Sequence, residues 1–301
     1  MKTIPKSIFE LRRILAPVDF SKPSRQGIAT AVTLAQQFGS QLAVAYITRR
    51  NRPDSHIAAE QLGLTFDTRL EGREKLAEFI EHEVPGDLQA TPIVADGVPF
   101  DEIAKAATQW KADLIVISTH GYTGLRHALL GSTAERVVRH APCPVLVVRG
   151  HGKRGRKTAF STGKLRSIVV PVDFSEPSLD ALAHALALAR KHEAQLTLLH
   201  VIEPRPPTML VDATQAHRNA RAAAHERLTQ LADTTKRVWS RTGRELRAGA
   251  PVDTITALAQ RANADLIVVG THGRTGLKRA FIGSVAERVV RLAPCPVLVV
   301  R

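Results

Sequence analysis

The sequence predicts an α/β protein built of two tandem doubly wound domains, each with a mostly parallel five-stranded sheet flanked by helices. Three observations support this prediction. First, about 28 of the 37 residues from Asp113 to Arg149 recur from Asp265 to Arg301. Second, apolar runs that suit strands alternate in both halves with amphipathic stretches that suit helices. Third, the strand-like runs are apolar on both faces, which is typical of parallel strands covered by helices.

Each half begins with a strand, a helix and a second strand. The first strand is a short β-branched run that ends in Pro-Val-Asp-Phe. The helix has apolar residues at helical spacing and opens with a serine that can cap its first turn. In the two halves these elements are expected at 12–20 and 166–174, at 21–38 and 175–192, and at 41–47 and 195–202.

The second part of each half also keeps one order. A polar, mostly helical stretch precedes a short strand, a helix, and an apolar strand that ends at a glycine-rich loop. A last helix reads SxAERVVR and a last strand reads CPVLVV. Right-handed crossovers between parallel strands then give a doubly wound domain. In the two halves, the polar stretch is expected at 52–84 and 205–242, the short strand at 90–95 and 244–248, and the next helix from 97 and from 249. The apolar strand is expected at 112–117 and 264–269, the last helix at 132–139 and 284–291, and the last strand at 143–148 and 295–300.

Length and composition indicate a soluble two-domain protein. At 301 residues, the chain divides into domains expected at 1–150 and 167–301, joined by a basic linker at 151–166. No run approaches the roughly 20 apolar residues that span a bilayer, and the N-terminus lacks the apolar core of a signal peptide, which predicts a cytoplasmic protein. Cys143 and Cys295 occupy equivalent places, which favours buried packing over a disulfide or a reactive thiol.

The net charge of +14 is concentrated in the linker and the second half. A basic chain can bind nucleic acid through phosphate contacts. However, the sequence has no helix-turn-helix, zinc-finger or RNA-recognition signature, and only 4% of its residues are aromatic. Neither nucleic acid nor a membrane is therefore an expected partner.

The glycine-rich loop of the second half is the strongest candidate for binding chemistry. Gly270 ends a strand, Gly273 follows, and Gly283 and Ser284 stand at the start of the last helix. Glycines let a phosphate approach the backbone, and a helix N-terminus offers uncommitted N–H groups. Asp173 ends another strand, and ligands of such sheets bind beyond the carboxyl ends of the strands. Positive charge between the glycines comes from Arg274, Lys278 and Arg279.

The pattern G-x2-G-x9-G-[ST], together with PVDFS and CPVLVV, resembles the universal stress protein family over nearly all of both halves. The resemblance implies a tandem member that binds ATP, with or without Mg²⁺. It implies that the glycine loop and helix start hold the phosphates and ribose, and that the ends of the first two strands line the base. In the second half, the residues implied to hold the phosphates and ribose are Gly270, Gly273, Gly283, Ser284 and Val285. Those implied to line the base are Pro171, Val172, Asp173 and Val201.

The first half departs from this pattern at one position. Ser118 stands where the second half has Gly270, and its side chain either crowds a nucleotide or hydrogen-bonds to it. The flanking charge is also weaker, so the second half is the better candidate for ATP binding. The other positions implied by the resemblance are Pro17, Val18, Asp19, Ile47, Gly121, Gly131, Ser132 and Thr133.

No residue is predicted to be catalytic or to bind a protein-held metal. His120 and His272 lie in the loops without a partner carboxylate or nucleophile at a revealing spacing, which favours loop ordering or phosphate contact over acid–base work. Asp19 and Asp173 are lone carboxylates, which favours contact with the base over Mg²⁺. The other histidines show no metal-ligand spacing.

These observations predict a nucleotide-dependent regulatory protein of the stress response, and not an enzyme. There is no Walker lysine motif, no kinase signature and no evident base to activate water, so ATP is expected to be held. One alternative is a slow ATPase or other nucleotide-hydrolysing enzyme. Another is a nucleotide-independent interaction module in which the CPVLVV edge strands pair the two domains or build a homodimer.

Overall fold

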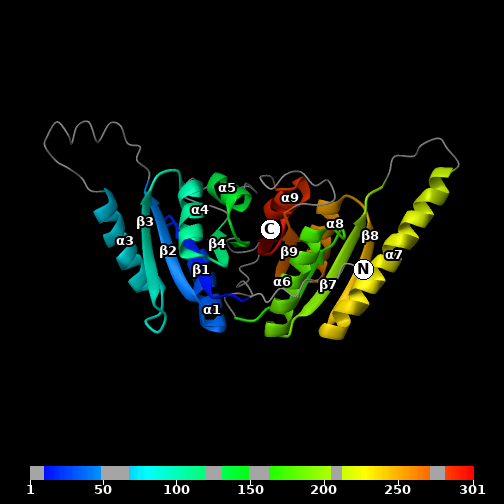
Figure 1. The fold of residues 1–301 in the computed structure, drawn as a ribbon, viewed down its shortest axis with the longest axis horizontal. Helices are drawn as coiled ribbons and strands as arrows, with labels where there is room; N and C mark the ends of the chain where they lie inside the picture. The colour runs from blue at the N-terminus through cyan, green and yellow to red at the C-terminus, as the bar shows by residue number, and fades with distance from the viewer. Residues whose placement is uncertain (1–9, 49–67, 119–130, 149–162, 205–211, 272–281) are drawn as a thin grey trace. The chain divides into compact units, whose positions relative to one another are not determined.

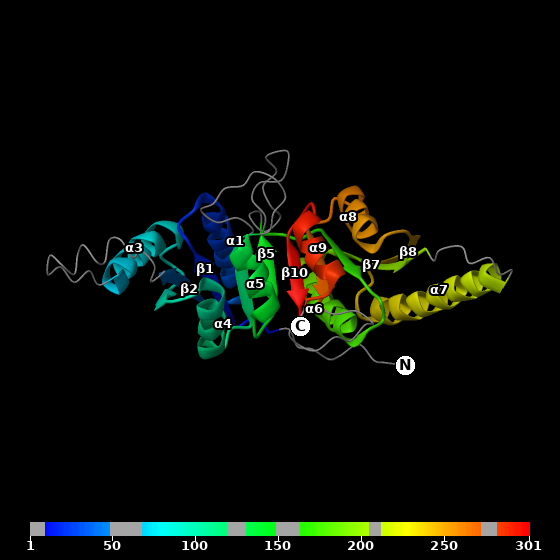
Figure 2. The same cartoon turned by 90° about the horizontal axis from the view of Figure 1, so that it is seen from above.

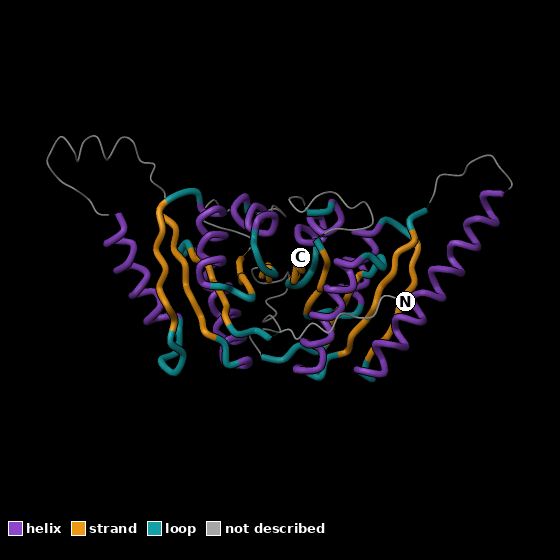
Figure 3. The backbone as a smooth tube through the Cα atoms, in the orientation of Figure 1, coloured by secondary structure: helices purple, strands orange, loops and turns teal. Residues whose placement is uncertain are grey.

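The computed structural model describes residues 10–48, 68–118, 131–148, 163–204, 212–271 and 282–301. The chain divides into two compact units, one formed by Glu10–His151 and the other containing Gly152–Arg301. Each unit contributes five strands that lie between layers of helices (Figures 1 and 3). The predicted fold class, two tandem doubly wound α/β domains, is confirmed. The predicted domain limits and the linker at 151–166, most of which lies outside the described residues, stay a prediction.

In the first unit the strand order is β3-β2-β1-β4-β5, and these neighbours pair in parallel. Helix α1 packs with α3, and α4 packs with α5 on the other face of the sheet (Figure 2). The elements are β1 Arg13–Val18, α1 Lys22–Phe38, β2 Gln41–Thr48, α3 Thr68–Glu83, β3 Ala90–Asp96, α4 Pro99–Trp110, β4 Leu114–Ser118, α5 Ser132–His140 and β5 Val145–Val148.

The second unit repeats this arrangement in the order β10-β9-β6-β7-β8, again with parallel pairs. Residues 168–170 of β6 and 266–269 of β9 are buried because helices cover both faces, as the continuous apolar runs predict. The elements are β6 Ser167–Pro171, α6 Glu176–His192, β7 Gln195–Ile202, α7 Asp212–Val238, β8 Thr242–Ala248, α8 Pro251–Arg261, β9 Leu266–Gly270, α9 Ser284–Leu292 and β10 Val297–Val300.

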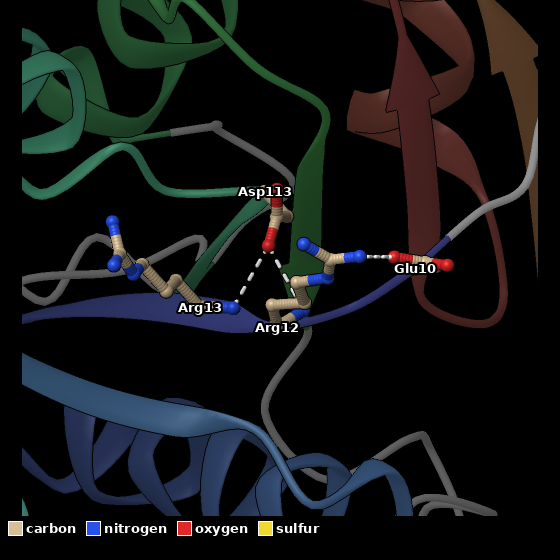
Figure 4. A network of polar contacts seen from close by, with 4 residues as sticks. All are labelled: Glu10, Arg12, Arg13 and Asp113. Atoms are coloured by element: carbon tan, nitrogen blue, oxygen red, sulfur yellow. Dashed lines mark hydrogen bonds and ion pairs between the residues drawn. The ribbon is translucent and has the colours of Figure 1, made fainter.

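A half-buried aspartate at the amino-terminal edge of the sheet fixes how the two central strands of each unit begin. In the first unit, one carboxylate oxygen of Asp113 accepts hydrogen bonds from the backbone N–H groups of Arg12 and Arg13, both at 2.8 Å (Figure 4). Arg12 also pairs with Glu10. Asp265 makes the same contacts to residues 166 and 167. The aspartate of each ADLIV motif therefore clamps β4 to β1, or β9 to β6, at the amino ends.

Both cysteines are buried, as the sequence predicts: Cys143 and Cys295 are each 8% exposed. No described helix combines the length and the apolar character that crossing a membrane requires.

Acidification is expected to weaken the second unit selectively. Burial in α6 lowers the pKa of His184 and of His192 below the usual 6.5, and Lys191 lowers that of His192 further. Since the unfolded chain then binds more protons than the folded one, this stabilisation is complete above about pH 6.5 and is lost as the pH falls through the folded pKa values. Helix α1 has Thr30 and Phe38 at the equivalent places.

Urea unfolding at several pH values between 7.5 and 5 measures this effect. A variant that carries the first-unit residues, His184→Thr with His192→Phe, should lose much of the pH dependence of the second unit. An equal loss of stability on acidification in parent and variant would contradict the assignment.

Candidate functional site

The order of the strands reverses between the first and fourth strand of each unit. In the second unit, β6, β7 and β8 succeed one another on one side, and β9 and β10 lie on the other. Strands β6 and β9 pair only at Ile168–Leu266 and Val169–Ile267, whereas β6 and β7 pair up to Pro171–Leu199. The two strands therefore stop pairing before their carboxyl ends, and this is where ligands of such sheets bind.

Asp173 and Gly270 lie at the carboxyl ends of these two parting strands. Asp19 and Ser118 occupy the same places beyond β1 and β4, whose pairing also covers only two positions. The predicted convergence of the aspartate and the glycine loop on one edge of the sheet thus follows from the observed topology.

The aspartate organises a tight turn that leads into α6. One carboxylate oxygen of Asp173 accepts hydrogen bonds from the backbone N–H of Ser175, at 3.0 Å, and from the Ser175 hydroxyl. Phe174 between them has a φ of 65°, a left-handed conformation that is rare for a bulky side chain. Asp19, Phe20 and Ser21 form the same turn before α1, with a φ of 60° at Phe20. The PVDFS motif therefore encodes this turn in both halves.

The residues before the aspartate are held within the sheet. The backbone N–H of Val172 donates to the carbonyl of Leu199 at 2.8 Å, and the Val172 carbonyl accepts from Nδ1 of His200 at 2.6 Å. Val172 is 3% exposed, and Pro171 is half-buried beside it. Both polar backbone groups of Val172 are thus used by the fold, and its side chain is buried, so its role in lining a ligand stays a prediction.

The start of α9 lies at the other side of the switch point. The backbone N–H of Gly283 donates to the carbonyl of Thr271 at 2.6 Å, and the Thr271 N–H donates to the carbonyl of Val300 at 2.9 Å. Thr271, which sequence reasoning did not select, thereby joins the ends of β9 and β10 to the helix start. Ser284 and Val285 are exposed in the first turn, and the N-cap residue, Gly283, has no side chain to cap it. Gly131, Ser132 and Thr133 begin α5 in the same way.

The two glycines of the second-half loop pattern that the structure describes, Gly270 and Gly283, are there for different reasons. A Cβ added to Gly270 would lie 2.5 Å from the backbone oxygen of Pro177 in α6, so close packing excludes any side chain. Gly283 has φ −64° and ψ 145°, which any residue adopts. Backbone conformation alone does not require a glycine here, and close approach of a ligand to the helix start is one reason for a missing Cβ.

The difference between Ser118 and Gly270 has a packing counterpart. In the first half, α1 carries Gly27 where α6 carries Ala181, and a Cβ at Gly27 would lie 3.9 Å from that of Ser118. Since Ser118 has a Cβ where Gly270 tolerates none, the first turn of α1 must stand further from its strand than that of α6 does. Whether Ser118 also affects a ligand stays a prediction.

Each unit places an aromatic cluster beside the aspartate turn. Phe20 packs against Tyr46 and Phe79, with ring centroids 4.5 Å and 5.3 Å away. Phe174 instead lies 4.7 Å from the ring of His200, and the guanidinium of Arg227 lies 4.4 Å from its centroid. Sequence reasoning missed these residues because no local pattern links positions that come from separate elements.

The remaining predicted positions are partly described. Val201 and Ile47 are half-buried near the carboxyl ends of β7 and β2. Among the described residues, no group of three or more His, Cys, Asp or Glu side chains could hold a metal ion. Gly121, Gly273, His120, His272 and the loop charges lie outside the described residues.

Both halves are similar to proteins of one family. The family model described as "Universal stress protein family" matches residues 10–149 and 164–301. A universal stress protein of Methanocaldococcus jannaschii is 36% identical over 139 residues, which is 45% of this chain and 82% of the relative. Universal stress protein E of Salmonella typhi is 24% identical over 96% of this chain and 94% of its own length. The crystal structure of a universal stress protein from Archaeoglobus fulgidus has the same fold, with a TM-score of 0.68, 21% identity and 97% of each chain covered.

Proposed function

We propose that this chain, which belongs to the universal stress protein family, is a nucleotide-dependent regulatory protein of the stress response that binds ATP at the switch point of its second half. The first turn of α9 would hold the phosphates through backbone N–H groups and the Ser284 hydroxyl. Asp173 and the end of β7 at Val201 would line the base. The first half offers the same arrangement around Asp19 and the start of α5.

The observation that carries this proposal is the start of α9 beside the carboxyl end of β9, at the edge of the sheet where the Asp173 turn follows β6. A helix N-terminus attracts anions, and the N-cap residue of α9 is a glycine, which has no side chain to occupy the first N–H groups of the helix. Gly283 adds a position whose backbone conformation does not itself require glycine. A phosphate-bearing ligand fits this combination.

The site favours holding the nucleotide over hydrolysing it. The Asp173 carboxylate accepts two hydrogen bonds from Ser175, so it serves the turn and is poorly placed to activate water. If Mg²⁺ accompanies ATP, the phosphates would supply most of its ligands. The competing proposal, a slow ATPase, predicts ATP hydrolysis that is lost when a larger side chain, as in Gly283→Val, occupies the phosphate side of the site.

Mass spectrometry of the co-purified nucleotide, followed by calorimetric titration with ATP, ADP, AMP and cyclic AMP, tests the proposal. We expect bound adenine nucleotide and a stoichiometry of one or two per chain, since each half carries the turn and the helix start. The absence of both bound nucleotide and binding heat would overturn the proposal and would favour the interaction module.

A further inference from the structure

Phe174 links the candidate site to α7 through a stack of three side chains. Its ring contacts the imidazole of His200 from β7 and the guanidinium of Arg227 from α7, at 4.7 Å and 4.4 Å between the centres given above. Phe174 directly follows Asp173 in the turn that leads into α6. Whatever holds this ring therefore also holds the carboxylate of Asp173.

The two supports of the ring differ in how firmly they are held. His200 is 6% exposed, donates to the Val172 carbonyl at 2.6 Å, and belongs to a strand paired on both sides. Arg227 is exposed and lies just before Leu228, the first buried residue described in α7. Between Arg218 and Arg227 every side chain is exposed except Ala224, which is half-buried. The stretch from Arg218 to Arg227 thus has little packing to keep it ordered.

The energies involved make the Arg227 contact significant for the turn. An aromatic residue in the left-handed region is strained, and such strain persists only where surrounding contacts hold it. A cation–π contact is of the same order as that strain. Removing one such contact is therefore enough to change how often the turn adopts its observed form.

We propose that Arg227 is a positioning residue for the candidate nucleotide site, which couples occupancy of that site to the order of α7. The inference rests on the proposed nucleotide binding. A ligand that requires the observed Asp173 turn favours the state in which Phe174 and Arg227 are in contact, and so stabilises the start of α7. By linkage, an ordered α7 strengthens ligand binding by the same factor.

Among its described residues, the first half has no arginine against the ring of its turn residue, Phe20. The ring of Phe20 is supported by Tyr46 and by Phe79, and Phe79 is only 6% exposed on α3. This cluster also contains a cation, since the guanidinium of Arg25 in α1 lies 5.1 Å from the centroid of the Phe79 ring. Arg25 therefore contacts Phe79 of α3, whereas Arg227 contacts the ring of the turn residue Phe174 itself. Occupancy of the first half should leave the order of α3 unchanged.

Hydrogen–deuterium exchange of the full chain with and without saturating ATP tests the coupling. In the parent, exchange of 212–227 should slow about 5- to 30-fold on ATP addition. In Arg227→Ala the slowing should be absent, and calorimetry should show ATP affinity at the second half weakened by a similar factor. Two matched controls should behave as the parent: Arg221→Ala, which removes an exposed arginine from the same helix, and Arg25→Ala, which removes an arginine–ring contact from the first half.

The outcomes separate this inference from the proposed function. ATP binding by calorimetry with unchanged exchange of α7 in the parent would refute the coupling and leave nucleotide binding intact. Equal ATP-induced slowing in the parent and in Arg227→Ala would also refute it. A parent that binds no ATP would remove the proposed function, and the inference with it. If the Arg227→Ala variant does not fold, exchange of α7 in the parent with and without ATP still tests whether ligand binding is coupled to the order of this helix.

Discussion

Replacing Gly270 with serine, the residue that the first half carries as Ser118, is expected to destabilise the second unit by about 3 kcal/mol. The added Cβ would lie 2.5 Å from the backbone oxygen and 2.6 Å from the carbonyl carbon of Pro177. Both are backbone atoms, which cannot rotate away as a side chain can, so α6 must shift as a body in a close-packed interior. For a unit of this size the melting temperature should fall by roughly 10 °C.

Thermal and urea unfolding of parent and variant measure this effect, and two variants serve as controls. Gly270→Ala should cost nearly as much as the serine, because the Cβ and not the hydroxyl makes the clash. Gly27→Ala in the first half should instead stabilise its unit by up to about 1 kcal/mol, since its Cβ would meet Ser118 no closer than 3.7 Å and alanine favours a helix. A Gly270→Ser variant as stable as the parent would show that α6 adjusts freely and that the glycine has another purpose.

This packing changes how the glycine pattern is interpreted. From the sequence, the glycines of the second-half loop form one phosphate-binding signal, and Ser118 marks a possible defect in the first half. The structure assigns Gly270 to the contact with Pro177, and the change at Ser118 accompanies Gly27 in the facing helix. A sequence pattern cannot separate a glycine needed by a neighbouring helix from one needed by a ligand, because both require the same missing Cβ.

The fold itself was largely predictable because its signals are local and duplicated. Strands apolar on both faces, such as that ending at Ser118, and helices opened by Ser21 and Ser175 are visible in short windows of sequence. Ser175 nevertheless differs from its expected role, since its hydroxyl donates to Asp173 and makes no side-chain cap. The contacts of Arg227 and His200 with Phe174 were beyond prediction, because they depend on which elements meet at the sheet edge.

Gly283→Val should weaken ATP binding at the second half by about 100-fold or more, with little effect on folding. Valine adopts φ −64° and ψ 145° without strain, and replacing glycine by this poorer N-cap residue costs about 1 kcal/mol. The same isopropyl group would stand beside the free N–H groups of Ser284 and Val285, where the phosphates are proposed to bind. A 100-fold loss corresponds to about 2.7 kcal/mol of binding energy, well above the expected effect on stability.

Calorimetric titration and urea unfolding of the same samples separate these two effects. Gly131→Val is the matched control, because Gly131 precedes α5 with φ −59° and ψ 139° and the change should remove only first-half binding. The double variant should bind no nucleotide and yet unfold as the parent does. If Gly283→Val kept the parent's affinity, the start of α9 would not be the phosphate site, and the glycine at Gly283 would require a reason within the fold.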